Sequence, residues 1–206
     1  MARLIGIAGS LRKGSYNAAL LRAAAEFAPA GTEVEIAPIT GIPLYNGDLE
    51  REQGIPEPVT KLKDRIAGAD GLLLVTPEYN NSMPGVLKNA IDWLSRPAKD
   101  IPRVFGDKPV AIMGATPGRG GTRLAQNAWL PVLRTLGTRA WFGEQIYVAG
   151  AGQAFDPEGK LIDETIKKLL SEFMSGFAAF VNVEGGTADR VRGTREGHVR
   201  ETFPAG

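Results

Sequence analysis

Short apolar runs alternate with segments of helical periodicity five times over the first 181 residues, and this alternation constrains the fold more than any other feature. The runs are predicted to be strands because they are short, rich in Ile, Leu and Val, and bounded by Gly or Pro. Residues 71–76 are apolar at consecutive positions, which indicates a strand buried on both faces. Such alternation is typical of a three-layer α/β sandwich, a parallel sheet with helices on both faces.

Five strands are predicted, at residues 3–8, 34–39, 71–76, 109–115 and 140–148. Five helices are predicted, at residues 17–27, 59–67, 83–94, 123–136 and 163–181. Together they form one predicted domain, residues 1–184, whereas the polar segment 185–206 lacks apolar periodicity and is predicted to be a flexible tail.

Individual residues sharpen these helix predictions. We expect Asn17 to cap the first helix, Ser82 to cap the third, and Pro131 to kink or break the fourth. The helical spacing of four apolar residues predicts the inner side of the last helix, namely Leu169, Phe173, Phe177 and Phe180.

Composition excludes several classes of function. The 206 residues include one His and no Cys, which excludes disulfides, thiolate metal sites and cysteine nucleophiles, and argues against a Ser-His-Asp triad or a multi-His metal site. The net charge of +1 gives no indication of nucleic-acid binding. No stretch approaches the roughly 20 apolar residues of a membrane helix, so we expect a cytoplasmic protein without membrane insertion.

Ligands of open parallel sheets bind beyond the carboxyl ends of the strands, where the strand order reverses. Three loops follow predicted strands there, at residues 9–17, 76–85 and 115–123, and all three are rich in Gly, Ser, Asn, Pro or Arg. Their convergence predicts one ligand site at this edge.

The first loop, GSLRKGSYN, combines hydroxyl groups, Arg12 and the start of a helix, which is typical of an anion site. It matches neither a Walker A loop nor the G-x-G-x-x-G pattern, which disfavours nucleoside triphosphate chemistry and a dinucleotide site at the first strand. The alternative is a capped turn with exposed charges.

The other two loops suit a flat ligand. The second, TPEYNNSMPG, is a stiff polar turn with an aromatic edge, in which Glu78 is more simply a solvated carboxylate than an acid–base catalyst. The third, ATPGRGGTR, lets main chain approach a ligand closely and offers Arg119 to a phosphate. The alternatives are a proline-stiffened turn and a flexible connection.

Three segments together closely resemble the NADPH-dependent FMN reductase family, over about residues 3–182. They are GSLRKGSYN after the first strand, PEYNNSMPGVLKNAIDWLSRP after the third, and GRGGTR after the fourth. The resemblance implies a flavodoxin-like fold, with a five-stranded parallel sheet in the order 2-1-3-4-5.

The resemblance also implies cofactor-binding residues in each loop. The first loop would hold the FMN phosphate, through Ser10, Arg12, Ser15, Tyr16 and Asn17. The second would contact the isoalloxazine ring, through Pro77, Glu78, Tyr79 and Asn80. The third would close on the other edge of the ring, through Thr116, Gly118, Arg119, Gly120 and Gly121.

The implied activity is FMN-dependent NAD(P)H oxidation by a ping-pong hydride mechanism, with a quinone as leading acceptor and with chromate, azo compounds or free flavin as others. No side chain is expected to be catalytic, because the chemistry takes place at flavin N5. The partners implied are a small-molecule acceptor and a second copy of the chain, in a homodimer or homotetramer. The alternative is a flavodoxin-like electron carrier or redox-responsive FMN-binding protein without NAD(P)H turnover.

Overall fold

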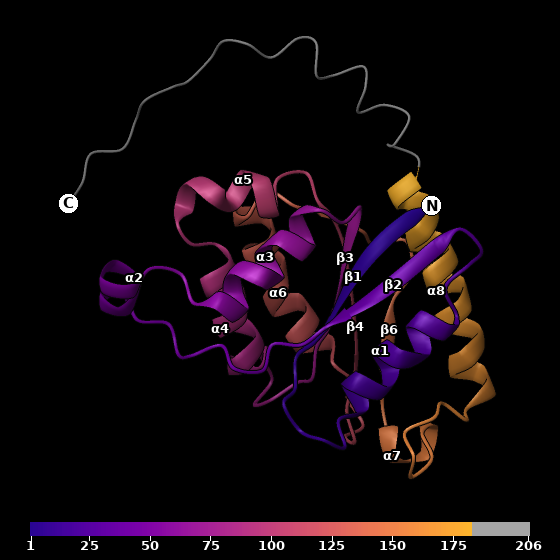
Figure 1. The fold of residues 1–206 in the computed structure, drawn as a ribbon. Helices are drawn as coiled ribbons and strands as arrows, with labels where there is room; N and C mark the ends of the chain where they lie inside the picture. The colour runs from indigo at the N-terminus through magenta and orange to yellow at the C-terminus, as the bar shows by residue number, and fades with distance from the viewer. Residues whose placement is uncertain (183–206) are drawn as a thin grey trace.

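Parallel strands build a single sheet at the centre of the computed structural model, which describes residues 1–182 (Figure 1). The predicted end of the domain at residue 184 and the predicted tail lie outside these residues. The strands are β1 (Ala2–Ala8), β2 (Thr32–Ala37), β3 (Gly71–Val75), β4 (Pro109–Ala115), β5 (Arg139–Ala140) and β6 (Ile146–Val148).

The sheet order is β2-β1-β3-β4-β5, with β6 also paired to β4, and every pairing is parallel. The flavodoxin-like α/β fold and the strand order are therefore confirmed. The helices are α1 (Tyr16–Glu26), α2 (Gly47–Gln53), α3 (Glu57–Ala67), α4 (Gly85–Leu94), α5 (Ile101–Val104), α6 (Arg123–Thr135), α7 (Ala151–Ala154) and α8 (Glu164–Asn182), with a 3-10 turn at Ala98–Asp100.

Two hydrophobic cores lie on opposite faces of the sheet. Leu4 and Leu73 point to the face covered by α1, α7 and α8, whereas Ile5, Leu72 and Leu74 point to the face covered by α3–α6. All five side chains are fully buried, and each contributes about 1.5–3 kcal/mol relative to an exposed position. This burial on both faces explains why the strands are apolar at consecutive positions.

The predicted fifth strand is interrupted. β5 pairs with Pro109–Val110 and β6 with Met113–Ala115, while residues 141–145 leave the sheet. Trp141 turns toward α8 and packs edge-on against Phe173, with ring centroids 5.0 Å apart. A β-carbon at Gly143 would lie 2.7 Å from the Trp141 indole, so the indole occupies space that only a glycine leaves.

Several helix predictions need correction. Ser15, not Asn17, caps α1, and its Oγ accepts a hydrogen bond from the Ala18 N–H at 3.2 Å. Ser82 does not cap α4, because its backbone is paired with Tyr79 in a turn. Pro131 does not break α6, which continues to Thr135 with the proline on its exposed side.

The inner side of α8 also differs from the prediction at one position. Leu169 is 39% exposed and Leu170 is buried instead, whereas Phe173 and Phe177 are fully buried and Phe180 is half-buried. The short helices α2, α5 and α7 were not predicted, and α2 buries none of its residues. No helix of residues 1–182 is long and apolar enough to cross a membrane.

Candidate active site

The three predicted ligand loops meet at one edge of the sheet. They follow β1, β3 and β4, whose carboxyl ends lie together because the strands are parallel (Figure 1). β1 lies between β2 and β3, so the strand order reverses here, and this reversal is where ligands of such sheets bind. The structure thus brings the three loops together as predicted.

The first loop ends in the N-terminus of α1, where Ser15 is buried and fixes the start of the helix. The backbone N–H groups of Tyr16 and Asn17 belong to the first turn, in which no intrahelical acceptor exists. Arg12 and Lys13 are exposed and make no ion pair among the described residues. Unpaired donors, two free cations and a positive helix end form a site for an anion such as a phosphate monoester.

Asn17 joins the first loop to the third. Its Nδ2 donates to the Ala115 carbonyl at 2.8 Å, and its Oδ1 accepts from the Ala115 N–H at 2.9 Å. The side chain is 3% exposed. Both groups of the amide are used in holding β4 against α1, so Asn17 positions the two loops.

The second loop is a tight turn over Tyr79–Ser82. The backbones of these two residues exchange hydrogen bonds of 3.1 and 3.0 Å. Asn80 and Asn81 adopt positive φ angles of 50° and 60°, a conformation that Asn tolerates better than other non-glycine residues. Tyr79 remains 48% exposed beside the other loops, where a flat ligand can contact it.

Glu78 joins the second loop to α6. Its Oε2 accepts hydrogen bonds from the N–H groups of Leu124 and Ala125, at 2.9 and 3.0 Å. These donors lie in the first turn of α6, whose N-cap residue Thr122 makes no side-chain cap bond. The interpretation of Glu78 as a solvated carboxylate was therefore wrong, because the carboxylate caps this helix.

The third loop is pinned at its base and open at its tip. Thr116 donates its N–H to Val148 and accepts from Ala151, while Gly150 donates to the Gly118 carbonyl. Gly121 has a φ angle of +66°, and a β-carbon there would lie 2.9 Å from that of Tyr147. The exposed tip, which includes Gly118, Arg119 and Gly120, presents main chain to the shared edge.

This arrangement can bind and orient a phosphorylated flat molecule, but it holds little acid–base chemistry. The described residues contain no cluster of His, Asp or Glu that could hold a metal ion. Glu78, the carboxylate of these loops, is already engaged with α6. The donor set therefore fits a flavin mononucleotide, a ligand that carries its own redox chemistry.

Known proteins are similar to this chain in both sequence and fold. The sequence profile of the NADPH-dependent FMN reductase family matches residues 2–153. The chain therefore belongs to the NADPH-dependent FMN reductase family, a family of oxidoreductases.

Individual relatives agree. An NAD(P)H-dependent FMN reductase of Pseudomonas aeruginosa is 42% identical over 179 residues, which are 87% of this chain and 95% of that protein. A 2-hydroxy-1,4-benzoquinone reductase of a Burkholderia species is 41% identical, over 85% of this chain and 93% of that one. The solved structure of FerB, an NAD(P)H:acceptor oxidoreductase of Paracoccus denitrificans, aligns with a TM-score of 0.79 at 35% identity, over 89% of this chain and 98% of that one.

Proposed function

We propose that this chain binds FMN at the three-loop edge and uses it to pass electrons from NAD(P)H to quinones. The observation that carries the proposal is the N-terminus of α1, which lies where the strand order reverses. Ser15, free backbone N–H groups and Arg12, which makes no ion pair among the described residues, can bind an anion there. The names of the relatives, FMN reductase and quinone reductase, support the same activity.

Each loop would hold one part of the cofactor. Ser10, Arg12, Ser15 and the N–H groups of Tyr16 and Asn17 would bind the phosphate. Pro77, Tyr79, Asn80 and the backbone of Glu78 would contact one side of the ring system. Thr116, Arg119 and the main chain of Gly118, Gly120 and Gly121 would meet its other edge.

When bound, FMN supplies hydride transfer between a nicotinamide and an acceptor. The chain's own residues bind and orient it. The bonds of Asn17 to Ala115 and of Glu78 to α6 hold the three loops in one arrangement, which lowers the ordering cost of binding. The exposed Tyr79 and the open third loop leave room for acceptors of different shape, including chromate, azo compounds and free flavin.

Steady-state NADPH oxidation with a quinone separates this proposal from an electron carrier without nicotinamide turnover. We expect FMN-dependent, quinone-dependent loss of NADPH absorbance. Bound FMN with no NADPH oxidation for any acceptor in a panel of quinones, chromate, azo dyes and free flavin would leave the carrier as the better account.

We also propose that the chain forms a homodimer or homotetramer. Leu44 is 82% exposed, and α2, which follows it, buries none of its own residues. The segment is nevertheless fixed, because the Trp93 Nε1–H and the Asn89 side chain both donate to the Pro43 carbonyl.

Sedimentation of the wild type and of Leu44→Glu tests the proposed oligomer. An oligomer that dissociates in the variant supports an interface at Leu44, and a wild-type monomer contradicts the proposal. Trp93 and Trp129 are fully buried within the chain, so neither lies at such an interface.

A further inference from the structure

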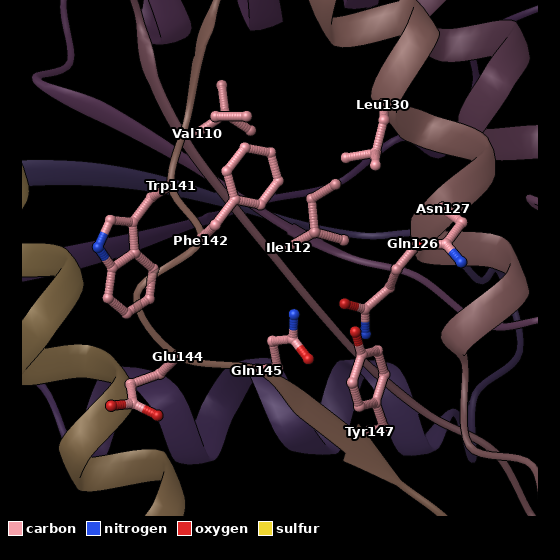
Figure 2. A pocket seen from close by; sticks show the side chains of 11 residues that line it. Val110, Ile112, Gln126, Asn127, Leu130, Trp141, Phe142, Glu144, Gln145 and Tyr147 are labelled. Atoms are coloured by element: carbon pink, nitrogen blue, oxygen red, sulfur yellow. The ribbon is translucent and has the colours of Figure 1, made fainter.

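The interruption of the fifth strand creates a pocket that lies outside the three ligand loops. From the Val110–Ala140 pair to the Met113–Ile146 pair, β4 advances three residues while its neighbour advances six. The excess residues loop outward and leave a small cavity that faces α6 and is open to solvent (Figure 2). Val110 and Ile112 lie at its floor, and Val110 is fully buried.

The walls of this pocket are open to solvent and combine apolar with polar side chains. Phe142 is 63% exposed and Leu130 is 37% exposed, and both point over the floor (Figure 2). Trp141 closes the side nearest α8. Large apolar side chains that gather around a cavity and stay accessible mark a binding surface more often than scattered exposed residues do.

One side-chain oxygen in the pocket has no protein donor among the described residues. Gln126 is 7% exposed, and its Nε2 donates to Thr122 Oγ1 at 3.0 Å and to the Ile146 carbonyl at 2.9 Å. Because a carbonyl only accepts, this bond fixes which end of the amide is nitrogen. No donor among the described residues reaches Oε1, which points into the pocket (Figure 2).

That oxygen is accessible from the cavity, since no fully enclosed side-chain polar atom of the described residues lacks a partner. In the empty pocket water can donate to this oxygen, so an occupant that displaces the water loses least when it donates a hydrogen bond in its place. The formal charge of the lining is a single carboxylate, Glu144, with no cation to balance an anionic ligand. This lining suits an uncharged, partly apolar occupant that donates a hydrogen bond, whereas FMN and nicotinamide dinucleotides are anionic.

We propose that this pocket binds small uncharged hydroxyaromatic molecules, of the phenol or hydroquinone class. The ring lies on Ile112 beneath Phe142, and the hydroxyl donates to Gln126 Oε1. None of the lining residues belongs to the three flavin loops, so this site is separate from the proposed cofactor site. Its occupancy does not depend on the redox activity of the chain.

Calorimetric titration of the FMN-saturated protein tests the proposal with three matched probes. 2-Naphthol can donate a hydrogen bond, 2-methoxynaphthalene can only accept one, and naphthalene can do neither. We expect saturable binding of 2-naphthol, and about fivefold weaker binding of the other two, since one neutral hydrogen bond contributes about 1 kcal/mol. Absence of 2-naphthol binding, or equal binding of all three probes, would overturn the proposal.

Two variants of α6 locate the binding. Leu130→Trp fills the mouth of the pocket and should abolish 2-naphthol binding. Leu124→Trp, at a 48% exposed position of the same helix outside the pocket lining, should leave it unchanged. If Leu130→Trp binds 2-naphthol as the wild type does, the probe binds elsewhere, and the proposal that it occupies this pocket is contradicted. Dissociation of an oligomer by Leu130→Trp, with no naphthol binding to the wild type, would assign the pocket to contact between copies and also contradict it.

Discussion

Asn17 and Ala115, 98 positions apart, are joined by two hydrogen bonds between one side-chain amide and both backbone groups of the other residue. Through them α1, the helix that follows the first loop, is fixed to the end of β4. The geometry of the whole ligand edge depends on this pair, because the first and third loops take their positions from it.

Replacing Asn17 by Ala should therefore lower both stability and FMN affinity. The substitution leaves the buried Ala115 N–H and carbonyl without partners, at a cost of roughly 2–4 kcal/mol in the free energy of unfolding. Urea denaturation measures it. Gln53→Ala, at an exposed α2 position, serves as the control and should change the free energy by less than about 0.5 kcal/mol. Equal, small losses in both variants would show that the pair does not hold the loops.

Glu78 should behave as a helix cap and not as a catalyst. Glu78→Ala removes the acceptor for two N–H groups of α6 and should cost about 1–2 kcal/mol in stability. Glu78→Gln keeps an oxygen acceptor and should retain most of the turnover with NADPH and a quinone. A Glu78→Gln protein with wild-type stability and no turnover would instead indicate a role in proton transfer.

Arg12 should discriminate between phosphorylated and unphosphorylated flavin. Since charge-assisted hydrogen bonds contribute about 1.5–3 kcal/mol, Arg12→Ala should weaken FMN binding by about tenfold or more. Riboflavin, which lacks the phosphate, should be affected much less. Flavin fluorescence quenching measures both affinities, and Arg134→Ala, at an exposed position in the last turn of α6, is the matched control. Equal losses for the two flavins would show that Arg12 is not the phosphate ligand.

Gly114 lies where the second and third loops approach β4. A β-carbon there would lie 2.2 Å from the Thr76 carbonyl oxygen and 2.3 Å from Thr122 Oγ1, so Gly114→Ala should destabilise the fold by about 3 kcal/mol or more. Gly85→Ala is the matched control, because nothing lies within 4 Å of the added carbon. Thermal unfolding of the two variants measures the difference in their stability. A Gly114→Ala protein as stable as the control would contradict the close packing of Gly114 against Thr76 and Thr122.

The anchor of α2 should weaken in acid. Glu50 accepts hydrogen bonds from Arg96 and from the Tyr45 hydroxyl, both at 2.9 Å, and the Arg96 bond is the main cause of its lowered pKa. A lowered carboxyl pKa stabilises the fold above the unfolded-state value, about 4.3, and the contribution is lost as pH falls through the folded-state pKa.

Glu50→Gln should therefore be less stable than the wild type at pH 7, by roughly 1 kcal/mol or less because Arg96 is partly exposed. The difference should disappear in strong acid. Glu52→Gln, exposed on the same helix, is the control. Urea denaturation of Glu50→Gln and the wild type, from pH 7 down to strong acid, measures the difference in their free energies of unfolding. A difference that does not change with pH would contradict a role for the Glu50 charge.

The architecture could be predicted from sequence because burial leaves a pattern of apolar residues. The pattern is a continuous run in strands buried on both faces and a helical spacing in helices buried on one side. Residues 71–75 are apolar throughout, and the spacing of Phe173 and Phe177 identifies the buried side of α8. α2 escaped prediction because none of its residues is fully buried and only Leu49 packs against the core, so its sequence carries no helical period of apolar residues. In the fifth strand, Gly143 after Trp141 was the available signal of the interruption.

The contacts that organise the site could not be predicted in the same way. Asn17–Ala115 and Glu78–Leu124 each join loops far apart in the sequence through a side-chain bond, and such bonds follow no period. Asn17 and Glu78 were identified as site residues from the family resemblance, but their structural partners became visible only in three dimensions. The same holds for Gln126, whose Oε1 has no protein donor among the described residues. Its surroundings depend on the residues that leave the sheet between β5 and β6, both of which pair with β4.

The central claim, that this edge binds a flavin that accepts electrons from NAD(P)H and gives them to a quinone, is tested most directly by one absorbance experiment. The purified protein, saturated with FMN and freed of excess, is recorded without oxygen, then with NADPH, then with a quinone. The account predicts a bound flavin spectrum that bleaches with NADPH and returns with the quinone. Protein that retains no FMN, or whose bound flavin does not bleach with either NADPH or NADH, would contradict it.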